Sequence, residues 1–313
     1  MNMQVNLEQA IVLLKSGNVV AIPTETVYGL AADASNEAAL RQVYAIKQRP
    51  ADNPLIVHIA DASFVNDWAA EFSPLAQKLA KAFWPGPFTL VLTAKDSVSN
   101  IVRGNQPTVA LRVPNHPMTL QLLKSSGLAL AAPSANKFTQ LSPTTAAHVT
   151  AGLGNSVAVL DGGGCKVGIE STIVAVMGEN WQLLRLGMLP EASIEALAGV
   201  PALKFKQAIK APGQHVLHYS PKTPIQLFQS REALVDFAKT SQKNCAALVI
   251  GEGECPVCHY LQLPKQATEA AEALYGALHQ LDALQVEQLL VEMPPRTLAW
   301  AAINDRLCRA AQV

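Results

Sequence analysis

The sequence predicts an α/β protein with two domains. The chain has 313 residues, which is more than one typical domain holds. Half of the residues are hydrophobic and 15% are charged, so the chain can bury a sizeable core. Short apolar runs typical of buried strands alternate with segments of helical spacing, which favours an α/β fold. We place the first domain at residues 1–200, a linker at 201–224 and a smaller parallel α/β domain at 225–313.

The net charge and the first residues of the sequence indicate which partners and which location to expect. Lys and Arg number 24, as do Asp and Glu, so the zero net charge does not favour nucleic acid or an anionic membrane as a partner. Residues 1–14 lack the layout of a signal peptide, and no apolar run approaches the ~18 residues of a membrane span. We therefore expect a cytoplasmic protein.

The five cysteines predict reduced thiols, because an odd number in a large chain does not suit a disulfide framework. Cys255-Pro-Val-Cys258-His259 matches a haem-attachment pattern and half of a zinc site. Haem attachment of this type needs export, and zinc needs a second ligand pair that no nearby residue supplies. We interpret the segment as a surface loop and expect no metal site in the protein.

In the first domain, helices are predicted where apolar residues recur every three or four positions and strands where apolar runs are short. The expected helices cover residues 7–14, 36–50, 73–85 and 191–197, and another begins at Ser142-Pro143. The expected strands cover residues 19–22, 53–59, 88–92, 108–113, 128–132, 157–160, 168–176 and 181–186. In the second domain, strands at 225–228, 246–250 and 289–292 alternate with helices at 232–239, 269–284 and 298–309, which predicts a parallel sheet.

Two polar loops follow predicted strands. Thr24, Glu25 and Thr26 come directly after the strand at 19–22, and Ser134 and Asn136 follow the strand at 128–132. Open α/β sheets form ligand crevices at the carboxyl ends of their strands, so these loops predict a binding site. The alternative is an ordinary strand exit, with Gly29 taking a left-handed turn.

Basic residues lie near these loops. Lys47 and Arg49 fall at the end of the helix at 36–50, where they either complement the helix dipole or bind phosphate. Arg112 shares one face of its strand with Thr108, and it requires an anionic partner, either a structural carboxylate or a group of a ligand. His58 shares a strand face with an isoleucine and is either a satisfied core residue or a site residue. Together these residues indicate an anion-binding α/β enzyme.

Six motifs make residues 5–200 resemble the YrdC-like family, specifically its two-domain threonylcarbamoyl-AMP synthases. In chain order they are PTETVYGL, Lys47-Gln48-Arg49, NPLIVHI, TVALRVP, APSAN and GIESTIV. The linker segment HVLHYSP is similar to the linker of the two-domain members, with Ser220 where the family usually has alanine. The C-terminal domain resembles the family in size and α/β character.

The resemblance implies a YrdC-like twisted open sheet with helices and a nucleotidyltransferase that acts in tRNA processing. Its expected reaction joins L-threonine, bicarbonate and ATP into threonylcarbamoyl-AMP and pyrophosphate, with Mg²⁺ accompanying the ATP. The product is expected to pass to a tRNA threonylcarbamoyl transferase. The carbamate formed on threonine must approach a triphosphate, so fixed cations are needed to offset the repulsion.

The resemblance also assigns roles to residues. The catalytic positions are Lys47, Arg49, Ser134 and Asn136. The threonine-binding positions are Thr26, His58, Arg112 and Ser171. The nucleotide-binding positions are Arg49, Asn53, Thr108, Ser134, Ser142 and Arg185.

The linker is predicted to act as a lid. It is long for a plain spacer and carries His218 and Tyr219, and the reaction gains from excluding water that would hydrolyse a mixed anhydride. We expect replacement of both residues to slow the reaction without lowering thermal stability.

Two other classes of function compete with this interpretation. One is an RNA-binding YrdC-like module, against which the balanced charge speaks, as it does against direct tRNA binding. The other is the carbamoyl-transfer domain of hydrogenase-maturation proteins, which would bring an acylphosphatase-like segment and zinc-finger cysteine pairs. The sequence shows neither feature in convincing form.

Overall fold

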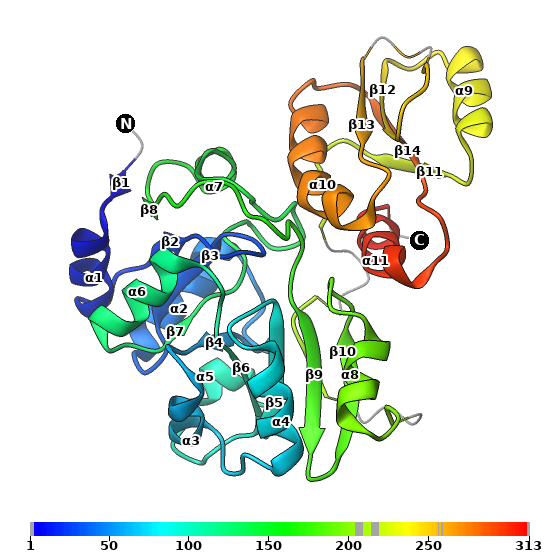
Figure 1. Ribbon diagram of the computed structural model, residues 1–313. Coiled ribbons are helices and arrows are strands. Elements are labelled where there is room, and N and C mark those ends of the chain that lie inside the picture. Colours follow the sequence, from blue (N-terminus) through cyan, green and yellow to red (C-terminus); the bar gives the residue numbers. More distant parts are fainter. Residues whose placement is uncertain (1–2, 204–208, 214–218, 256, 258, 312–313) are drawn as a thin grey trace. The chain divides into compact units, whose positions relative to one another are not determined.

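The structure is a computed structural model that describes residues 3–203, 209–213, 219–255, 257 and 259–311. The chain divides into two compact units, and the elements of each are labelled in Figure 1. The first unit comprises Met1–Phe138, Pro143–Lys166 and Glu170–Gln214. The second comprises Thr139–Ser142, Val167–Ile169 and His215–Val313.

The first unit is built on a mixed sheet whose strands, within the described ranges, run in the order β1-β8-β2-β3-β7-β4-β6-β5-β9-β10. These strands are β1 (Gln4–Val5), β2 (Val20–Ile22), β3 (Gly29–Asp33), β4 (Ile56–His58), β5 (Phe88–Thr93), β6 (Thr108–Arg112), β7 (Leu130–Ala131), β8 (Ala158–Leu160), β9 (Thr172–Met177) and β10 (Asn180–Arg185). Strand β6 pairs in parallel with β4 and antiparallel with β5, and β5 pairs in parallel with β9. These four strands are the part of the sheet on which the predicted site depends.

Several helices of this unit begin at a side chain that accepts a hydrogen bond from one of their first amides. Asn6, Asn36 and Ser73 each accept a hydrogen bond from a backbone N–H in the first turn of their helix. The helices are α1 (Leu7–Lys15), α2 (Glu37–Lys47), the 3₁₀ turn η1 (Ala62–Phe64), α3 (Val65–Trp68), α4 (Pro74–Phe83), α5 (Asn100–Arg103), α6 (Pro117–Ser126), α7 (Ala146–Leu153) and α8 (Glu191–Ala198). Helices α1 and α6 lie side by side, as Figure 1 shows.

One face of β4, β6, β5 and β9 is apolar at its centre and polar toward one end. Because side chains alternate along a strand, Ile56 and Ala110 share this face with His58 and Arg112. The apolar part packs against Ile209 and Ala211, which the sequence placed in the linker. The other face of these strands packs on α4 and α8 in the main core.

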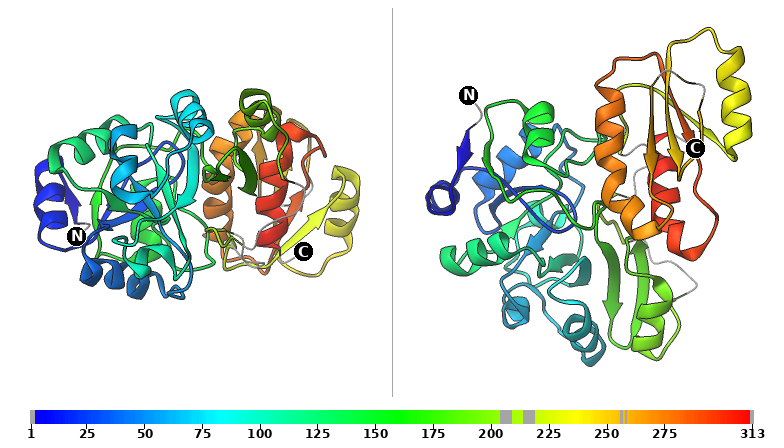
Figure 2. Two further views of the ribbon diagram at one scale, coloured as in Figure 1. Left: turned by 90° about the horizontal axis from the view of Figure 1, so that it is seen from below. Right: turned by 45° about the horizontal axis from the view of Figure 1, so that its top comes forward.

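The second unit contains a parallel sheet of order β11-β14-β12-β13. Its strands are β11 (Ile225–Phe228), β12 (Cys245–Ile250), β13 (His259–Leu263) and β14 (Gln288–Glu292). Its helices are α9 (Arg231–Thr240), α10 (Ala267–Asp282), the 3₁₀ turn η2 (Leu298–Trp300) and α11 (Ala301–Ala310). Helices α10 and α11 lie on one side of the sheet and α9 on the other (Figures 1 and 2). The predicted small parallel α/β domain is confirmed.

Two short segments from the middle of the chain belong to the second unit. The Thr139 carbonyl accepts a hydrogen bond from the Ser220 amide at 2.8 Å. Gly168 has a φ of +77°, and a Cβ there would lie 2.2 Å from the Ala271 carbonyl oxygen and 2.4 Å from the Glu272 Cα. A side chain at 168 is therefore excluded both by the backbone conformation and by the packing of α10.

Tyr219 is part of the core of the second unit. Its side chain is 1% exposed, the Arg306 guanidinium lies 4.8 Å from its ring centroid, and Tyr275 lies 6.1 Å away. Removing a buried aromatic side chain costs about 3 to 5 kcal/mol. We therefore correct the expectation that replacement of Tyr219 leaves thermal stability unchanged. His218 lies outside the described residues.

Several boundaries differ from the predictions. The helix expected at Ser142-Pro143 begins at Ala146, where Thr145 caps it, and the strand expected from residue 168 begins at Thr172. Gly29 opens strand β3 rather than a left-handed turn. Within the segment expected to be a surface loop, Cys255 is buried and His259 begins β13. No helix in the described ranges is long and apolar enough to cross a membrane.

Candidate active site

The predicted threonine-binding residues lie on the polar end of the β4–β6–β5–β9 face. Arg112 and His58 are register partners on β6 and β4, and Thr89 on β5 is opposite Ile173 on β9. Ser171 precedes β9, and its hydroxyl lies 2.8 Å from the Thr89 hydroxyl. These predicted residues therefore share one face of the sheet, with His58 and Arg112 at the carboxyl ends of β4 and β6, where the sequence had placed the site.

Arg112 is buried and contacts three groups of its own unit. Its Nε donates to the Gly86 carbonyl at 3.2 Å, and Nη1 donates to the Thr26 hydroxyl at 3.0 Å. Its Nη2 lies 2.7 Å from Oε1 of Glu25, and both side chains are almost completely buried. The sequence left open whether the partner of Arg112 is a structural carboxylate or a ligand. In this structure it is the carboxylate of Glu25.

His58 is buried beside this ion pair. Burial, and next the charge of Arg112, lower the pKa of His58 from 6.5 to about 3. Its Nδ1 has no hydrogen-bond partner within the described ranges. The imidazole is therefore neutral across the physiological range and presents a buried polar atom on the face that carries Arg112.

We expect the neutral state of His58 to make the protein sensitive to acid. The unfolded chain takes up the imidazole proton near pH 6.5, whereas the folded protein does so only near pH 3. Between these values the unfolded state binds more protons, so the free energy of unfolding falls as pH falls, by about 1.4 kcal/mol per pH unit. Urea unfolding at a series of pH values should show a shallower fall for His58→Asn than for the unchanged protein. Equal slopes would contradict a neutral buried imidazole.

Lys47 joins the end of α2 to the loop that carries Ser134 and Asn136. Its Nζ donates to the carbonyl oxygens of Ser134 at 2.5 Å and Asn136 at 2.6 Å. The Phe138 amide returns a hydrogen bond to the Lys47 carbonyl at 2.7 Å. The predicted Lys-x-Arg and Ser-x-Asn motifs are thus held together by one lysine that is 1% exposed.

The pKa of Lys47 depends on its burial and on two neighbouring charges. Burial and the charge of Arg49 lower this pKa well below its usual value, and the charge of Glu170 acts in the opposite direction. Gln48 takes a left-handed conformation, with φ 52°, at the end of α2. Arg49 follows it, donates to the Pro54 carbonyl at 3.2 Å and stacks 5.8 Å from the ring centroid of Phe138. Two buried basic side chains therefore lie at this helix end.

Ser171 and Arg185 are directly bonded, although the resemblance assigns them to different substrates. Nη2 of Arg185 donates to the Ser171 hydroxyl at 3.0 Å, and Nε donates to the Ser171 carbonyl at 3.0 Å. Nη1 donates to the Pro212 carbonyl at 3.2 Å. The predicted linker thus contacts a predicted nucleotide-binding residue through Pro212.

Backbone hydrogen bonds connect the two polar loops found in the sequence. The Ala135 amide donates to the Tyr28 carbonyl at 2.8 Å, and Gly29 pairs with Ser134. The loop after β2 and the loop after β7 therefore adjoin each other. This brings Thr26 into the same region of the first unit as Ser134.

Other predicted residues are less closely joined. Asn53 and Thr108 are half-buried, and the Asn53 side chain donates long hydrogen bonds to the Pro50 carbonyl at 3.4 Å and the Asp52 carboxylate at 3.5 Å. Ser142 belongs to the second unit, where its carbonyl accepts a hydrogen bond from His279. The part of the chain that the structure describes contains no group of three or more His, Cys, Asp or Glu side chains that could hold a metal ion.

Three residues of this region were given no substrate or catalytic role from the sequence. Glu25 was visible between the two threonines, and its partner could be found only from the fold. Glu170 lies next to Ser171 in the GIESTIV motif, and its charge acts on Lys47. Thr89 gave no signal, because its contact with Ser171 depends on the pairing of β5 with β9.

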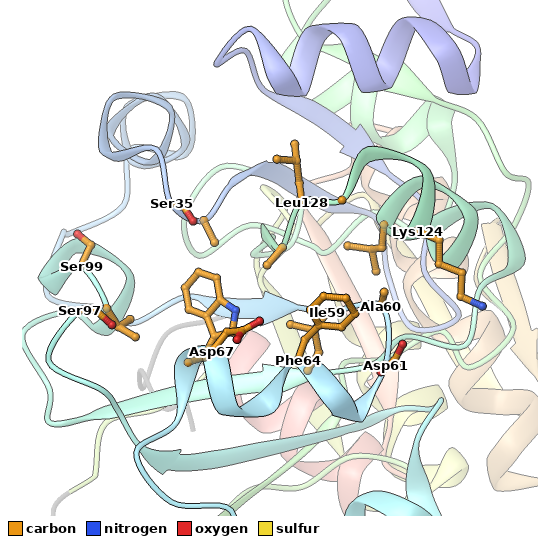
Figure 3. A pocket seen from close by; sticks show the side chains of 16 residues that line it. Ser35, Ile59, Ala60, Asp61, Phe64, Asp67, Ser97, Ser99, Lys124 and Leu128 are labelled. Atoms are coloured by element: carbon orange, nitrogen blue, oxygen red, sulfur yellow. The ribbon is translucent and has the colours of Figure 1, made fainter.

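A separate cavity of about 620 Å³ lies in the first unit, away from these residues (Figure 3). It is lined by Ala34 at the end of β3 and by Ala129 before β7, which are the strand ends opposite the polar loops. Figure 3 shows Phe64 and Leu128 directed into it. No predicted site residue lines this cavity.

Family models match almost the whole chain. The Sua5_yciO_yrdC model, described as "Telomere recombination", matches residues 12–187. A model described as "Threonylcarbamoyl-AMP synthase, C-terminal domain" matches residues 188–312.

Individual proteins match over a similar length. The chain is 38% identical to a threonylcarbamoyl-AMP synthase of Bacillus subtilis, over 97% of this chain and 92% of that protein. It is 36% identical to one of Pyrococcus abyssi, over 95% and 92% of the two chains. The crystal structure of P. abyssi Sua5 complexed with L-threonine superposes with a TM-score of 0.90 at 33% identity, covering 99% and 97% of the two chains.

Proposed function

The chain belongs to the two-domain threonylcarbamoyl-AMP synthase family, and we propose that it joins L-threonine, bicarbonate and ATP into threonylcarbamoyl-AMP and pyrophosphate. The observation that carries the proposal is the set of buried cations in the first unit. Lys47 and Arg49 lie at the end of α2, and Arg112 and Arg185 lie on β6 and β10. Buried cations of this number are suited to a substrate with several negative charges.

Arg112 is the proposed partner of the threonine carboxylate. A guanidinium binds a carboxylate through two parallel N–H groups, and Nη2 of Arg112 has no aligned hydrogen bond within the described ranges. Thr26, His58 and Ser171 would complete the threonine site. The P. abyssi relative, whose structure contains L-threonine, supports this assignment.

Lys47, Arg49 and Arg185 are the proposed partners of the nucleotide phosphates, together with Ser134 and Asn136. Asn53, Thr108 and Ser142 are proposed as further nucleotide contacts. The donor groups of the first set are cationic or neutral, so Mg²⁺ would be carried by the phosphate oxygens of ATP. It would neutralise charge that the lysine and arginines do not reach.

The linker is proposed to limit access of water. Ile209 and Ala211 already cover the apolar part of the site face, and Pro212 accepts a hydrogen bond from Arg185. A covered site protects a mixed anhydride from hydrolysis. We further propose that the protein acts in the cytoplasm and that a tRNA threonylcarbamoyl transferase consumes its product.

The proposed function is tested by following pyrophosphate release. We expect release that requires L-threonine, bicarbonate, ATP and Mg²⁺ together, with threonylcarbamoyl-AMP as the nucleotide product by mass spectrometry. Release without threonine would indicate plain ATP hydrolysis. Binding of tRNA in a filter assay that weakens steeply with salt, without turnover, would instead favour the RNA-binding alternative.

A further inference from the structure

Glu25 is a buried carboxylate with an incomplete set of partners. Its side chain is 8% exposed, and its Oε1 lies 2.7 Å from Nη2 of Arg112. Neither oxygen accepts a hydrogen bond within the described ranges, and Nη2 of Arg112 also lacks one. The two groups are therefore close without being aligned for hydrogen bonding. Buried ion pairs of this kind are poor stabilisers, because their charges lose hydration that the pair does not fully replace.

The charges of this pair match those of an amino-acid zwitterion. In an amino acid the ammonium nitrogen and the carboxylate carbon are about 2.5 Å apart, as bond geometry requires. We propose that Glu25 binds the threonine ammonium group while Arg112 binds the carboxylate, and that Glu25 then accepts the ammonium proton when the carbamate forms. This inference rests on the proposed function.

The exchange of partners keeps the site electrically balanced. The Glu25–Arg112 pair is neutral as a whole, and so is the threonine zwitterion, so binding exchanges one buried ion pair for two without adding net charge. Thr26 remains bonded to Nη1 of Arg112 and keeps the guanidinium in place. Each N–H group or carboxylate oxygen that lacks an aligned partner gains a charged one. Hydrogen bonds between charged groups are stronger than those between neutral groups.

The proton transfer balances with bicarbonate as the named reactant. The ammonium group gives one proton to Glu25, and the resulting amine attacks the bicarbonate carbon. A C–N bond forms, a C–O bond breaks and water leaves, which gives the carbamate anion and the protonated Glu25 carboxyl group. A general base placed against the reacting group typically contributes about 10² to 10⁴ in rate.

The neighbouring ionisable groups are neutral, so they offer the threonine ammonium group no negative charge to pair with. Burial raises the pKa of the Cys165 thiol to about 12, so it stays protonated at neutral pH. Burial lowers the pKa of His116 below its usual value, so that imidazole is mainly neutral at pH 7. His58 is neutral for the same reason. Glu25 and Arg112 thus supply the opposite charges of the threonine site.

The experiment compares threonine with 2,3-dihydroxybutyrate, which replaces the ammonium group by a hydroxyl. Calorimetry on the full chain should show that the unchanged protein prefers threonine by about 30-fold or more, the loss that follows from an unpaired buried charge. In Glu25→Gln this preference should fall to within about threefold, and pyrophosphate release should fall about 100-fold. Glu25→Asp keeps the charge, so it should keep the preference for threonine while turnover falls.

A matched control is available in the second unit. Glu292 forms an ion pair with Arg231 at the same 2.7 Å, and Glu292→Gln should leave both threonine preference and turnover unchanged. If Glu25→Gln folds and keeps the full preference for threonine, or if Glu25→Asp loses it, the inference is overturned. If the unchanged protein shows no release dependent on threonine and bicarbonate, the proposed function fails instead.

Discussion

Replacing Arg112 with alanine is expected to abolish measurable threonine binding while leaving ATP affinity nearly unchanged. The guanidinium is held on its strand face by Gly86 and Thr26, so its remaining N–H groups have a defined direction. Loss of a buried charged partner costs about 2 to 5 kcal/mol, which corresponds to a 30-fold to several-thousand-fold loss of affinity. Calorimetric titration of each substrate separately measures both effects.

Arg112→Ala also leaves Glu25 without its ion-pair partner, so thermal unfolding must accompany the titration. Arg112→Lys keeps a positive charge for Glu25 and removes the fork, and it should still lose at least about tenfold in threonine affinity. Arg231→Ala removes an arginine from an ion pair of the same length in the second unit and should not affect threonine binding. Equal losses of threonine affinity and ATP affinity in Arg112→Ala would contradict the assignment of Arg112 to the threonine carboxylate.

Replacing Lys47 with methionine is expected to lower turnover by about 10³-fold. Its ammonium group holds the Ser134–Asn136 loop and, in the proposed function, would also supply charge to the nucleotide phosphates. Methionine fills a similar volume without donating a hydrogen bond. The two carbonyl oxygens then lose a charged donor inside the protein, at about 1 to 3 kcal/mol each. ATP affinity should fall at least about tenfold, and the melting temperature should fall as well.

The control for this substitution is Lys239→Met in the second unit. Lys239 is 61% exposed and lies 3.6 Å from Asp236, and exposed pairs of this kind contribute at most about 1 kcal/mol. It should leave melting temperature and turnover close to those of the unchanged protein. If Lys47→Met kept normal ATP affinity and turnover, its role would be limited to the fold.

The period of two along a strand was enough to predict which residues share the site face. Thr108 and Arg112 were placed together on this basis, and so were His58 and its isoleucine neighbour, and the structure confirms both pairs. The sequence did not show that four strands present their polar ends on one face, because that depends on pairing between distant segments. For the same reason the ion pair of Arg112 with Glu25 could not be predicted. Thr26, the residue after Glu25, already lies 86 positions before Arg112 in the chain.

The composition of the linker predicted only part of its structure. Its loss of periodicity and its histidines and tyrosine indicated a functional segment, but not which residues pack. Ala211 is buried against the first unit and Tyr219 within the second. Burial of single residues in an irregular segment leaves no periodic pattern in the sequence, and contacts of this kind are visible only in three dimensions.

The inclusion of Thr139–Ser142 and Val167–Ile169 in the second unit sets an order for synthesis of the protein. These segments leave the ribosome early, but Gly168 packs against Ala271 and Glu272, which are translated later. With roughly a hundred residues in between and a rate of about 5 to 20 residues per second, the segments wait on the order of 5 to 20 s for their partners. The second unit is therefore completed only after α10 has been translated, although two of its segments come from the middle of the chain.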